Sequence, residues 1–244
     1  MSLATQLERE LEPLGTPARA NGSKAYLKSQ LAFFGVTVPD LRRTVRAAER
    51  AAPLASRAAL FATVDALWNR GVFKLKLAAV ELLARRDDLV TAASLSRLRG
   101  LIASSHTWAL VDPLSTGVVA GVYEREPAIA RTLDAWARHD DFWIRRAALL
   151  AHLPQLRRGA GDFARFARFA DAMLDEREFF IRKAIGWVLR ETSKRRPVLV
   201  ADWLAPRIAR VSGVTLREAV KYLPAGRKKL LLTARASPRS ASAR

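Results

Sequence analysis

The stretch "FFIRKAIGWVLRET", from Phe179 to Thr192, decides the fold class of this protein. Its most apolar positions recur at intervals of three and four residues: Ile181, Ala184, Ile185 and Val188. This spacing places them on one face of an α-helix. The stretch "FKLKLAAVELLARR" at 73–86 has the same spacing, and similar patterns cover most of the chain. The sequence therefore predicts an all-α protein.

These helical patterns repeat along the chain. Aligning them puts one set of residues at equivalent positions: Phe73, Trp108, Phe142, Phe179 and Val214. Successive members lie about 35 residues apart, an interval typical of α-solenoids built from helix pairs. We predict an α-solenoid of about six HEAT-like antiparallel helix pairs with a concave basic groove. It would form a single domain over residues 1–236, followed by a basic tail at 237–244.

The charge of the chain indicates an acidic partner. Lysine and arginine number 42 against 23 aspartates and glutamates, which gives a formal net charge of +19. Nucleic acid is the usual partner of such a protein, while anionic membranes and acidic proteins are the alternatives. The sequence has no apolar stretch of membrane-spanning length and no signal-peptide pattern, so we expect a cytoplasmic protein that associates with the nucleoid when it is on DNA.

Several classes of chemistry are disfavoured by residues that the chain lacks. It contains no cysteine, and its three histidines, His106, His139 and His152, do not share a helical face. It also lacks the glycine-rich loops that hold nucleotide phosphates. We therefore predict neither a metal site nor a cofactor.

The segment "HTWALVDP", His106 to Pro113, carries a carboxylate in this basic chain. Trp108 and Asp112 are four residues apart, so on a helix they point into the same space. Pro113 has to kink this helix or lie near its start. Asp112 could instead form a salt bridge or a helix cap.

A second stripe on the helix at 179–192 points to a ligand. Lys183, Trp187 and Arg190 follow spacings of four and three, away from the apolar face. A solvated face would not ordinarily carry a tryptophan, so we predict that this stripe lines the basic groove. The pairs Arg42 and Arg43 and the run at 227–229 add basic edges. For Trp68, Trp136 and Trp203 we expect core packing instead.

Five blocks together resemble the bacterial DNA glycosylases of the AlkD type, which are HEAT-like-repeat enzymes that remove alkylated purines. They are "KAYLKSQLAFFGV" (24–36), "TWALVD" (107–112), "DDFWIRRAALL" (140–150), "EFFIRKAIGWVLRE" (178–191) and "REAVKYL" (217–223).

The resemblance implies site residues. The family's catalytic tryptophan, aspartate and tryptophan fall on Trp108, Asp112 and Trp187. Its phosphate-contacting arginine falls on Arg146, and further groove positions match a set of aromatic and cationic residues: Tyr26, Phe179, Phe180 and Arg190. The chain departs from the pattern around the aspartate, where Thr107, Ala109 and Pro113 stand.

The function that the resemblance implies is base excision repair. The chain is expected to be a DNA glycosylase that hydrolyses the N-glycosidic bond of positively charged purines, such as 7-methylguanine and 3-methyladenine, in duplex DNA. It would act as a monomer and without extruding the base into a pocket. Two alternatives are a non-catalytic protein that binds DNA structures and a helical scaffold for acidic proteins. Neither alternative explains the set of Trp108, Asp112 and Trp187.

Overall fold

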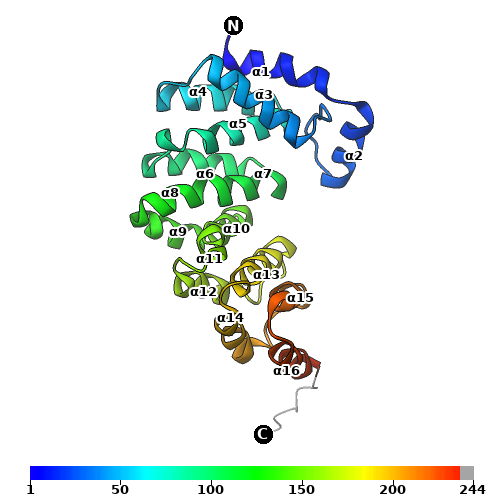
Figure 1. The fold of residues 1–244 in the computed structure, drawn as a ribbon, viewed down its shortest axis with the longest axis vertical. Helices are drawn as coiled ribbons and strands as arrows, with labels where there is room; N and C mark the ends of the chain where they lie inside the picture. Colours follow the sequence, from blue (N-terminus) through cyan, green and yellow to red (C-terminus); the bar gives the residue numbers. More distant parts are fainter. Residues whose placement is uncertain (237–244) are drawn as a thin grey trace. The chain divides into compact units, whose positions relative to one another are not determined.

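The structure is a computed structural model that describes residues 1–236, and these residues fold into helices joined by short turns (Figure 1). The all-α prediction is confirmed. Extended backbone pairs at one isolated β-bridge between Ala32 and Val72, and no sheet forms within residues 1–236. None of the helices in this range combines the length and the apolar character needed to span a membrane. The tail predicted at 237–244 lies outside the described residues.

The chain divides into two compact units, Met1–Ile129 and Ala130–Arg244. The first unit contains these α-helices: α1 (Leu3–Leu11), α2 (Pro17–Leu27), α3 (Val38–Ala51), α4 (Arg57–Trp68), α5 (Phe73–Arg85), α6 (Leu95–Ala103), α7 (Trp108–Pro113) and α8 (Ala120–Arg125). A π-helical segment, η4 (Leu114–Val119), joins α7 to α8. Short 3₁₀ turns complete the unit: η1 (Glu12–Leu14), η2 (Asp87–Leu89), η3 (Ala92–Ser94) and η5 (Pro127–Ile129).

The second unit contains the remaining helices: α9 (Ala130–Trp136), α10 (Phe142–Leu150), α11 (Leu153–Arg157), α12 (Phe163–Ala172), α13 (Phe179–Ser193), α14 (Pro197–Leu204), α15 (Gly213–Ala219) and α16 (Ala225–Ala236). Its 3₁₀ turns are η6 (Ala205–Arg207) and η7 (Val220–Tyr222). The single domain predicted over 1–236, the continuous solenoid and its groove stay predictions.

The repeated sequence position marks the start of a helix. Phe73, Trp108, Phe142 and Phe179 are each the first residue of a helix, and Val214 is the second residue of α15. In four of these helices the N-cap residue fixes the start of the helix, because its side chain accepts a hydrogen bond from a backbone N–H of the first turn. The four caps are Thr107, Asp141, Glu178 and Ser212.

In the first unit, α5 occupies a central place. It packs against α3, α4 and α7, and its apolar face, including Leu75, Ala78 and Leu82, is buried. Burial of such side chains, at about 25 cal/mol per Å² of apolar surface, is what holds the helices together.

In the second unit, α13 is the helix with most neighbours: it packs against α10, α11, α14 and α15. The predicted apolar stripe, Ile181, Ala184, Ile185 and Val188, is fully buried. The contact with α15 is close because Gly186 has no side chain. A Cβ added there would lie 2.9 Å from the Cβ of Glu218 and 3.0 Å from the backbone oxygen of Thr215.

Gly186→Ala should therefore destabilise the protein. Forcing backbone and side chain apart costs about 1 to 3 kcal/mol, which exceeds the helix-propensity gain of about 1 kcal/mol from replacing glycine. We expect the free energy of unfolding to fall by about 1 kcal/mol in urea denaturation. Gly100→Ala in α6 is the matched control, because a Cβ there meets no atom within 4 Å. Equal stability of the two variants would contradict the tight α13–α15 contact.

A buried histidine makes stability depend on pH. His152 is 1% exposed, and its ring lies edge-on to the rings of Phe166 and Phe169, with centroids 6.3 and 5.4 Å away. Burial lowers the pKa of His152 from 6.5 to about 4. The fold thus favours the neutral ring, and the stability that depends on neutrality is complete above pH 6.5 and is lost as the pH falls toward 4.

We expect the free energy of unfolding to decrease by about 3 kcal/mol across that window, from 1.36 kcal/mol per pKa unit. Denaturation of wild type and of His152→Leu at a series of pH values measures the decrease. His152→Leu should lack the decrease in the free energy of unfolding that the histidine causes. Parallel plots of unfolding free energy against pH for the two proteins would refute the role of His152.

Candidate functional site

Trp108 and Asp112 lie on one face of α7. The backbone N–H of Ala109 donates to the Thr107 hydroxyl at 3.3 Å, which starts the helix at Trp108. Asp112 follows four residues later, still in helical conformation, and both side chains are partly exposed. Residues spaced by four are neighbours on a helix surface. The structure therefore brings the indole and the carboxylate together, as the sequence predicted.

Pro113 does not end this helix. The proline is the sixth residue of α7, and the chain continues as the π-helical η4 and then as α8. Two hydroxyls add bonds to this stretch of backbone: Ser115 donates to the carbonyl of Val111 at 2.6 Å, and Thr116 donates to the carbonyl of Asp112 at 2.8 Å. π-Helical turns are frequent at functional sites. The backbone on both sides of Asp112 is thereby fixed despite the proline.

Tyr26 lies against Trp108. The two rings meet edge to face, with centroids 6.1 Å apart and an interplanar angle of 88°. Tyr26 belongs to α2 and is 74% exposed. An exposed aromatic ring beside a partly exposed indole offers stacking surface to a base or a sugar. The structure thus joins the predicted groove residue Tyr26 to the predicted catalytic Trp108.

The turn before α7 is held by a buried lysine. The ammonium of Lys76 donates to the Ser104 carbonyl at 3.4 Å and lies 4.7 Å from the ring centroid of Trp68. The indole N–H of Trp68 in turn donates to the Ser104 hydroxyl at 3.0 Å. Burial lowers the pKa of Lys76. This contact fixes the segment that leads to Trp108.

A cavity of about 210 Å³ lies between α3, α5 and η4 in the first unit. Arg42 and Glu81 line it together with Pro113 and Thr116, so the predicted DNA contact Arg42 borders the same space as the helix of Asp112. Arg42 is exposed and its Nε is 3.3 Å from Glu81. Arg43 is also exposed and pairs with Asp40 of its own helix.

In the second unit, the predicted stripe of α13 is partly exposed, as expected. One face of the helix carries Lys183, Trp187 and Arg190. This face is partly exposed, whereas the apolar stripe that includes Ile181 is buried. Their cationic members are not isolated. Lys183 Nζ lies 2.7 Å from Glu218 Oε1, and the Arg190 guanidinium pairs with the other oxygen of Glu218.

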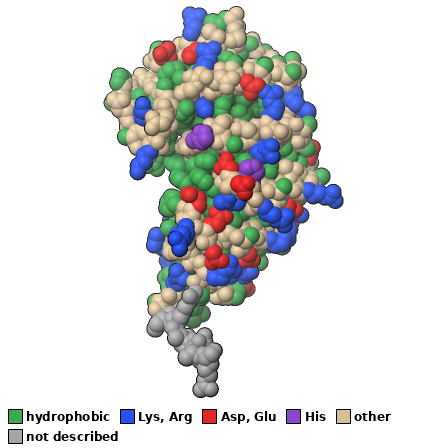
Figure 2. All heavy atoms as spheres, turned by 180° about the vertical axis from the view of Figure 1, so that it is seen from behind, with side chains coloured by type: hydrophobic (Ala, Val, Ile, Leu, Met, Phe, Trp, Pro, Cys, Tyr) green, Lys and Arg blue, Asp and Glu red, His purple; other side chains and the backbone are tan. Residues whose placement is uncertain are grey.

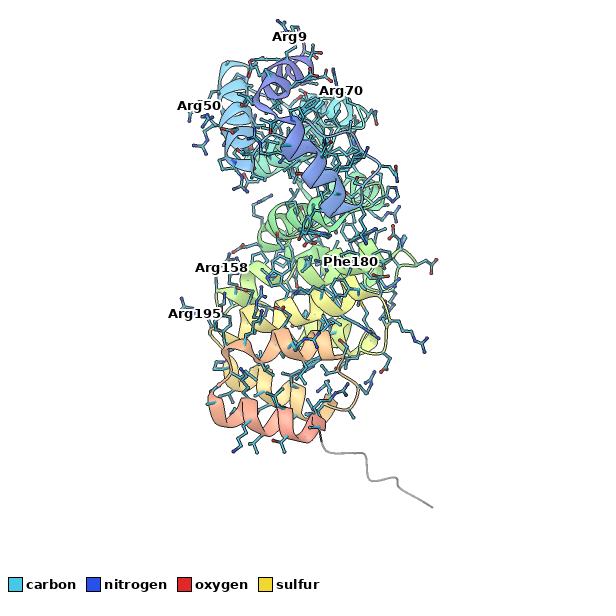
Figure 3. All side chains as sticks on the ribbon, turned by 90° about the vertical axis from the view of Figure 1, so that its right-hand side faces the viewer. Arg9, Arg50, Arg70, Arg158, Phe180 and Arg195 are labelled. Atoms are coloured by element: carbon cyan, nitrogen blue, oxygen red, sulfur yellow. The ribbon has the colours of Figure 1, made fainter. Side chains whose placement is uncertain are left out.

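Aromatic rings gather at the beginnings of α10 and α13, where Phe180 is seen in Figure 3. The Phe180 ring centroid is 4.9 Å from that of Trp143, 5.4 Å from that of Phe179 and 6.3 Å from that of Phe142. Phe179 is 53% exposed. The cluster therefore presents an exposed ring, Phe179, beside the partly exposed rings of Phe142 and Phe180, and Trp143 is buried beneath them.

Arg146, predicted to contact a phosphate, is 3% exposed. Its Nη1 donates to the backbone carbonyl of Phe180, and its guanidinium carbon is 5.9 Å from the centre of the Phe180 ring. In the structure this arginine links α10 to the first turn of α13. Its phosphate contact stays a prediction, and it requires that the side chain be uncovered.

The exposure of the tryptophans separates two groups. Trp68, Trp136 and Trp203 are buried, which confirms the core packing expected of them. Trp108 and Trp187 keep partial exposure. The two indoles assigned to chemistry by the resemblance are thus accessible to a ligand.

The surface is rich in cations. On the face shown in Figure 2, lysine and arginine side chains are spread among carboxylates. Within residues 1–236, no group of three or more histidine, aspartate or glutamate side chains is arranged to hold a metal ion.

The described residues thus form an all-α protein that carries a tryptophan and a carboxylate on α7 of the first unit and a partly exposed cationic face on α13 of the second. A family model described as DNA alkylation repair enzyme matches residues 7–223. The match covers most of the chain, so the protein belongs to the DNA alkylation repair enzyme family.

Solved structures share the fold. A predicted DNA alkylation repair enzyme from Enterococcus faecalis superposes with a TM-score of 0.78 at 21% identity, over 86% of this chain and 97% of that one. AlkD2 from Streptococcus mutans superposes with a TM-score of 0.54 at 15% identity, over 91% of this chain and 98% of that one. The comparison with curated proteins gives no match.

The sequence missed two features of the site. One is Glu218, the acceptor of Lys183 and Arg190; its place at the position equivalent to Asp112 was the available signal. The other is Lys76, whose burial within an apolar helix pattern has no signal in the sequence.

Proposed function

We propose that the protein is a DNA glycosylase that removes positively charged alkylated purines, of the 7-methylguanine and 3-methyladenine type, from duplex DNA. The bond that it breaks is the N-glycosidic bond, which is hydrolysed. The observation that carries the proposal is the pairing of a partly exposed indole, Trp108, with the carboxylate of Asp112 on one capped helix. Membership of the DNA alkylation repair enzyme family supports it.

Release of a positively charged base does not require a strong general acid. Alkylation at a ring nitrogen gives the purine a positive charge, so the base departs with the bonding electron pair as a neutral molecule. The sugar is left with oxocarbenium character at C1′. A carboxylate at this point stabilises the developing positive charge and accepts a proton from the water that adds to C1′. Asp112 is proposed for both tasks.

The indoles are proposed to hold the cationic groups in place. The electron-rich face of tryptophan attracts a cation by about 0.5 to 2 kcal/mol, depending on desolvation. Trp108, with Tyr26 at its edge, would serve one side of the reaction centre. Trp187 is assigned as the second catalytic indole by the resemblance.

DNA binding is proposed to rest on phosphate contacts that do not depend on sequence. Lys183, Arg190, Arg42 and Arg43 are the exposed or partly exposed cations assigned to it, and Arg146 is assigned by the resemblance. Such contacts make affinity fall steeply with salt. Since the backbone is gripped, the base need not leave the stack for a pocket, and the proposed enzyme does not extrude it.

Asp112→Asn should abolish most base release while leaving DNA binding intact. The amide keeps the size of the side chain and removes its charge, so the rate should fall about 100-fold or more, as for the loss of one electrostatic stabiliser. Single-turnover release from methylated duplex DNA measures the rate, and fluorescence anisotropy measures the binding. Asp65→Asn is the control, since it removes the same charge from α4 of the same unit. Release by Asp112→Asn at the wild-type rate would defeat the proposal, and binding without release by wild type would favour a non-catalytic DNA-binding protein.

Selectivity should follow the charge of the lesion. Duplexes that carry one 7-methylguanine or one uracil differ in whether the departing base is cationic before the bond breaks. We expect release from the first and none above background from the second, measured by chromatography of the freed bases. Comparable release of uracil would show that the carboxylate does not act on a cationic leaving group.

A further inference from the structure

One buried carboxylate in the second unit is shared by three cations. Glu218 of α15 is 8% exposed. Its Oε1 lies 2.7 Å from Lys183 Nζ and 3.3 Å from Lys221 Nζ, and its Oε2 pairs with Arg190. Three positive charges against one negative charge leave this group of side chains, which we call the Glu218 cluster, with an excess of two positive charges.

The backbone is built to admit this carboxylate. Glu218 lies directly over Gly186, where a side chain would collide with its Cβ. Gly186 stands between Lys183 and Arg190 on α13, so the carboxylate reaches both cations across the helix contact. Trp187 occupies the same face, four residues after Lys183 and three before Arg190.

Arg190 is held from a second side. Its Nε donates to Glu191 at 3.2 Å, while its Nη1 pairs with Glu218. Glu191 is itself 5% exposed and is shared with Lys194 and Arg157. Within the described residues, Arg190 makes these bonds through Nε and Nη1, which leaves the hydrogens of Nη2 for an external acceptor.

Glu218 keeps its negative charge over the whole physiological range. Burial raises the pKa of Glu218, but the hydrogen bond from Lys183 and the charges of Arg190 and Lys183 outweigh it and lower the pKa to about 2. The carboxylate is therefore a permanent counter-ion.

We propose that Glu218 is a positioning residue: it holds Lys183 and Arg190, with Lys221 beside them, as one binding site for a DNA phosphate next to Trp187. The carboxylate fixes the two long side chains before DNA arrives and neutralises part of their charge. Fixed cations leave less conformational freedom to be lost on binding. Partial neutralisation lowers the affinity for DNA in general, so Glu218 also limits binding to undamaged sites. The link to base release rests on the proposed glycosylase function, whereas the phosphate site does not.

Glu218→Gln separates these two effects, because it keeps the shape of the side chain and removes the charge. Binding of an undamaged fluorescent duplex is measured by anisotropy at potassium chloride concentrations from about 50 to about 200 mM. We expect tighter binding at low salt and a logarithmic salt slope steeper by about one, the change for one further phosphate contact. Single-turnover release of 7-methylguanine should fall about tenfold, because the cations are no longer held in place.

Two further variants make the outcome decisive. Asp175→Asn removes an exposed carboxylate that pairs with Arg210 in the same unit, and its salt slope should equal that of wild type. Glu218→Asp keeps the charge and shortens the side chain, so it should keep the wild-type slope and lose release. Thermal melts verify that each variant is folded.

The proposal is overturned if Glu218→Gln leaves both the slope and the release rate unchanged, or if it weakens binding with no change of slope. Failure of the glycosylase function gives a different result. In that case wild type releases no base, while Glu218→Gln still binds undamaged DNA more tightly and with the steeper slope.

Discussion

The start of each repeated helix is the constraint on which the other features depend. A capping side chain fixes the first residue, as Thr107 does for Trp108 and Glu178 does for Phe179. Once the start is fixed, the helical period decides which later positions are buried and which remain accessible. The fourth position after the repeated residue is then occupied in these helices by residues of different chemistry: Leu77, Asp112, Arg146, Lys183 and Glu218. One geometric position thus supplies a proposed catalytic carboxylate, cations and a counter-ion.

Ion pairs between neighbouring segments of the chain shape the electrostatics of the second unit. Arg145 pairs with Glu176, Arg165 with Asp134, and Arg207 with Asp171, each joining residues more than thirty positions apart. These side chains are partly exposed, and ion pairs that solvent reaches stabilise little individually, about 0 to 1 kcal/mol. Their larger effect is on the field: carboxylates that are engaged in such pairs leave the excess of cations to act on a polyanion.

The fold could be predicted from the sequence because it rests on periodicity. The buried stripe of α13 follows from the spacing of Ile181, Ala184 and Ile185, and the cores around Trp68 and Trp136 follow from the general preference of tryptophan for burial. The pairing of Trp108 with Asp112 was also predictable, since it depends only on helical spacing. These are local properties of the chain.

Other features depend on contacts between distant residues, and the sequence could not predict them. The burial of Arg146 depends on its bond to the Phe180 carbonyl, and the state of Lys183 depends on Glu218, thirty-five positions away. The sequence indicated a kink or an early position for Pro113. The chain instead continues from Pro113 into the π-helical η4, where the hydroxyls of Ser115 and Thr116 bond to the carbonyls of Val111 and Asp112, and helix propensity does not reveal this local geometry.

The π-helical η4 has a consequence for the direction in which Trp108 and Asp112 point. A π-helical turn accommodates one residue more than an α-helical turn, as if a single residue had been inserted. One residue corresponds to about 100° of rotation around an α-helix. Deleting a residue such as Gly117 would restore an ordinary helix, but it would turn Trp108 and Asp112 through about that angle relative to the buried face of α8. The irregular turn therefore sets the angle between the buried face of α8 and the partly exposed face of α7 that carries Trp108 and Asp112.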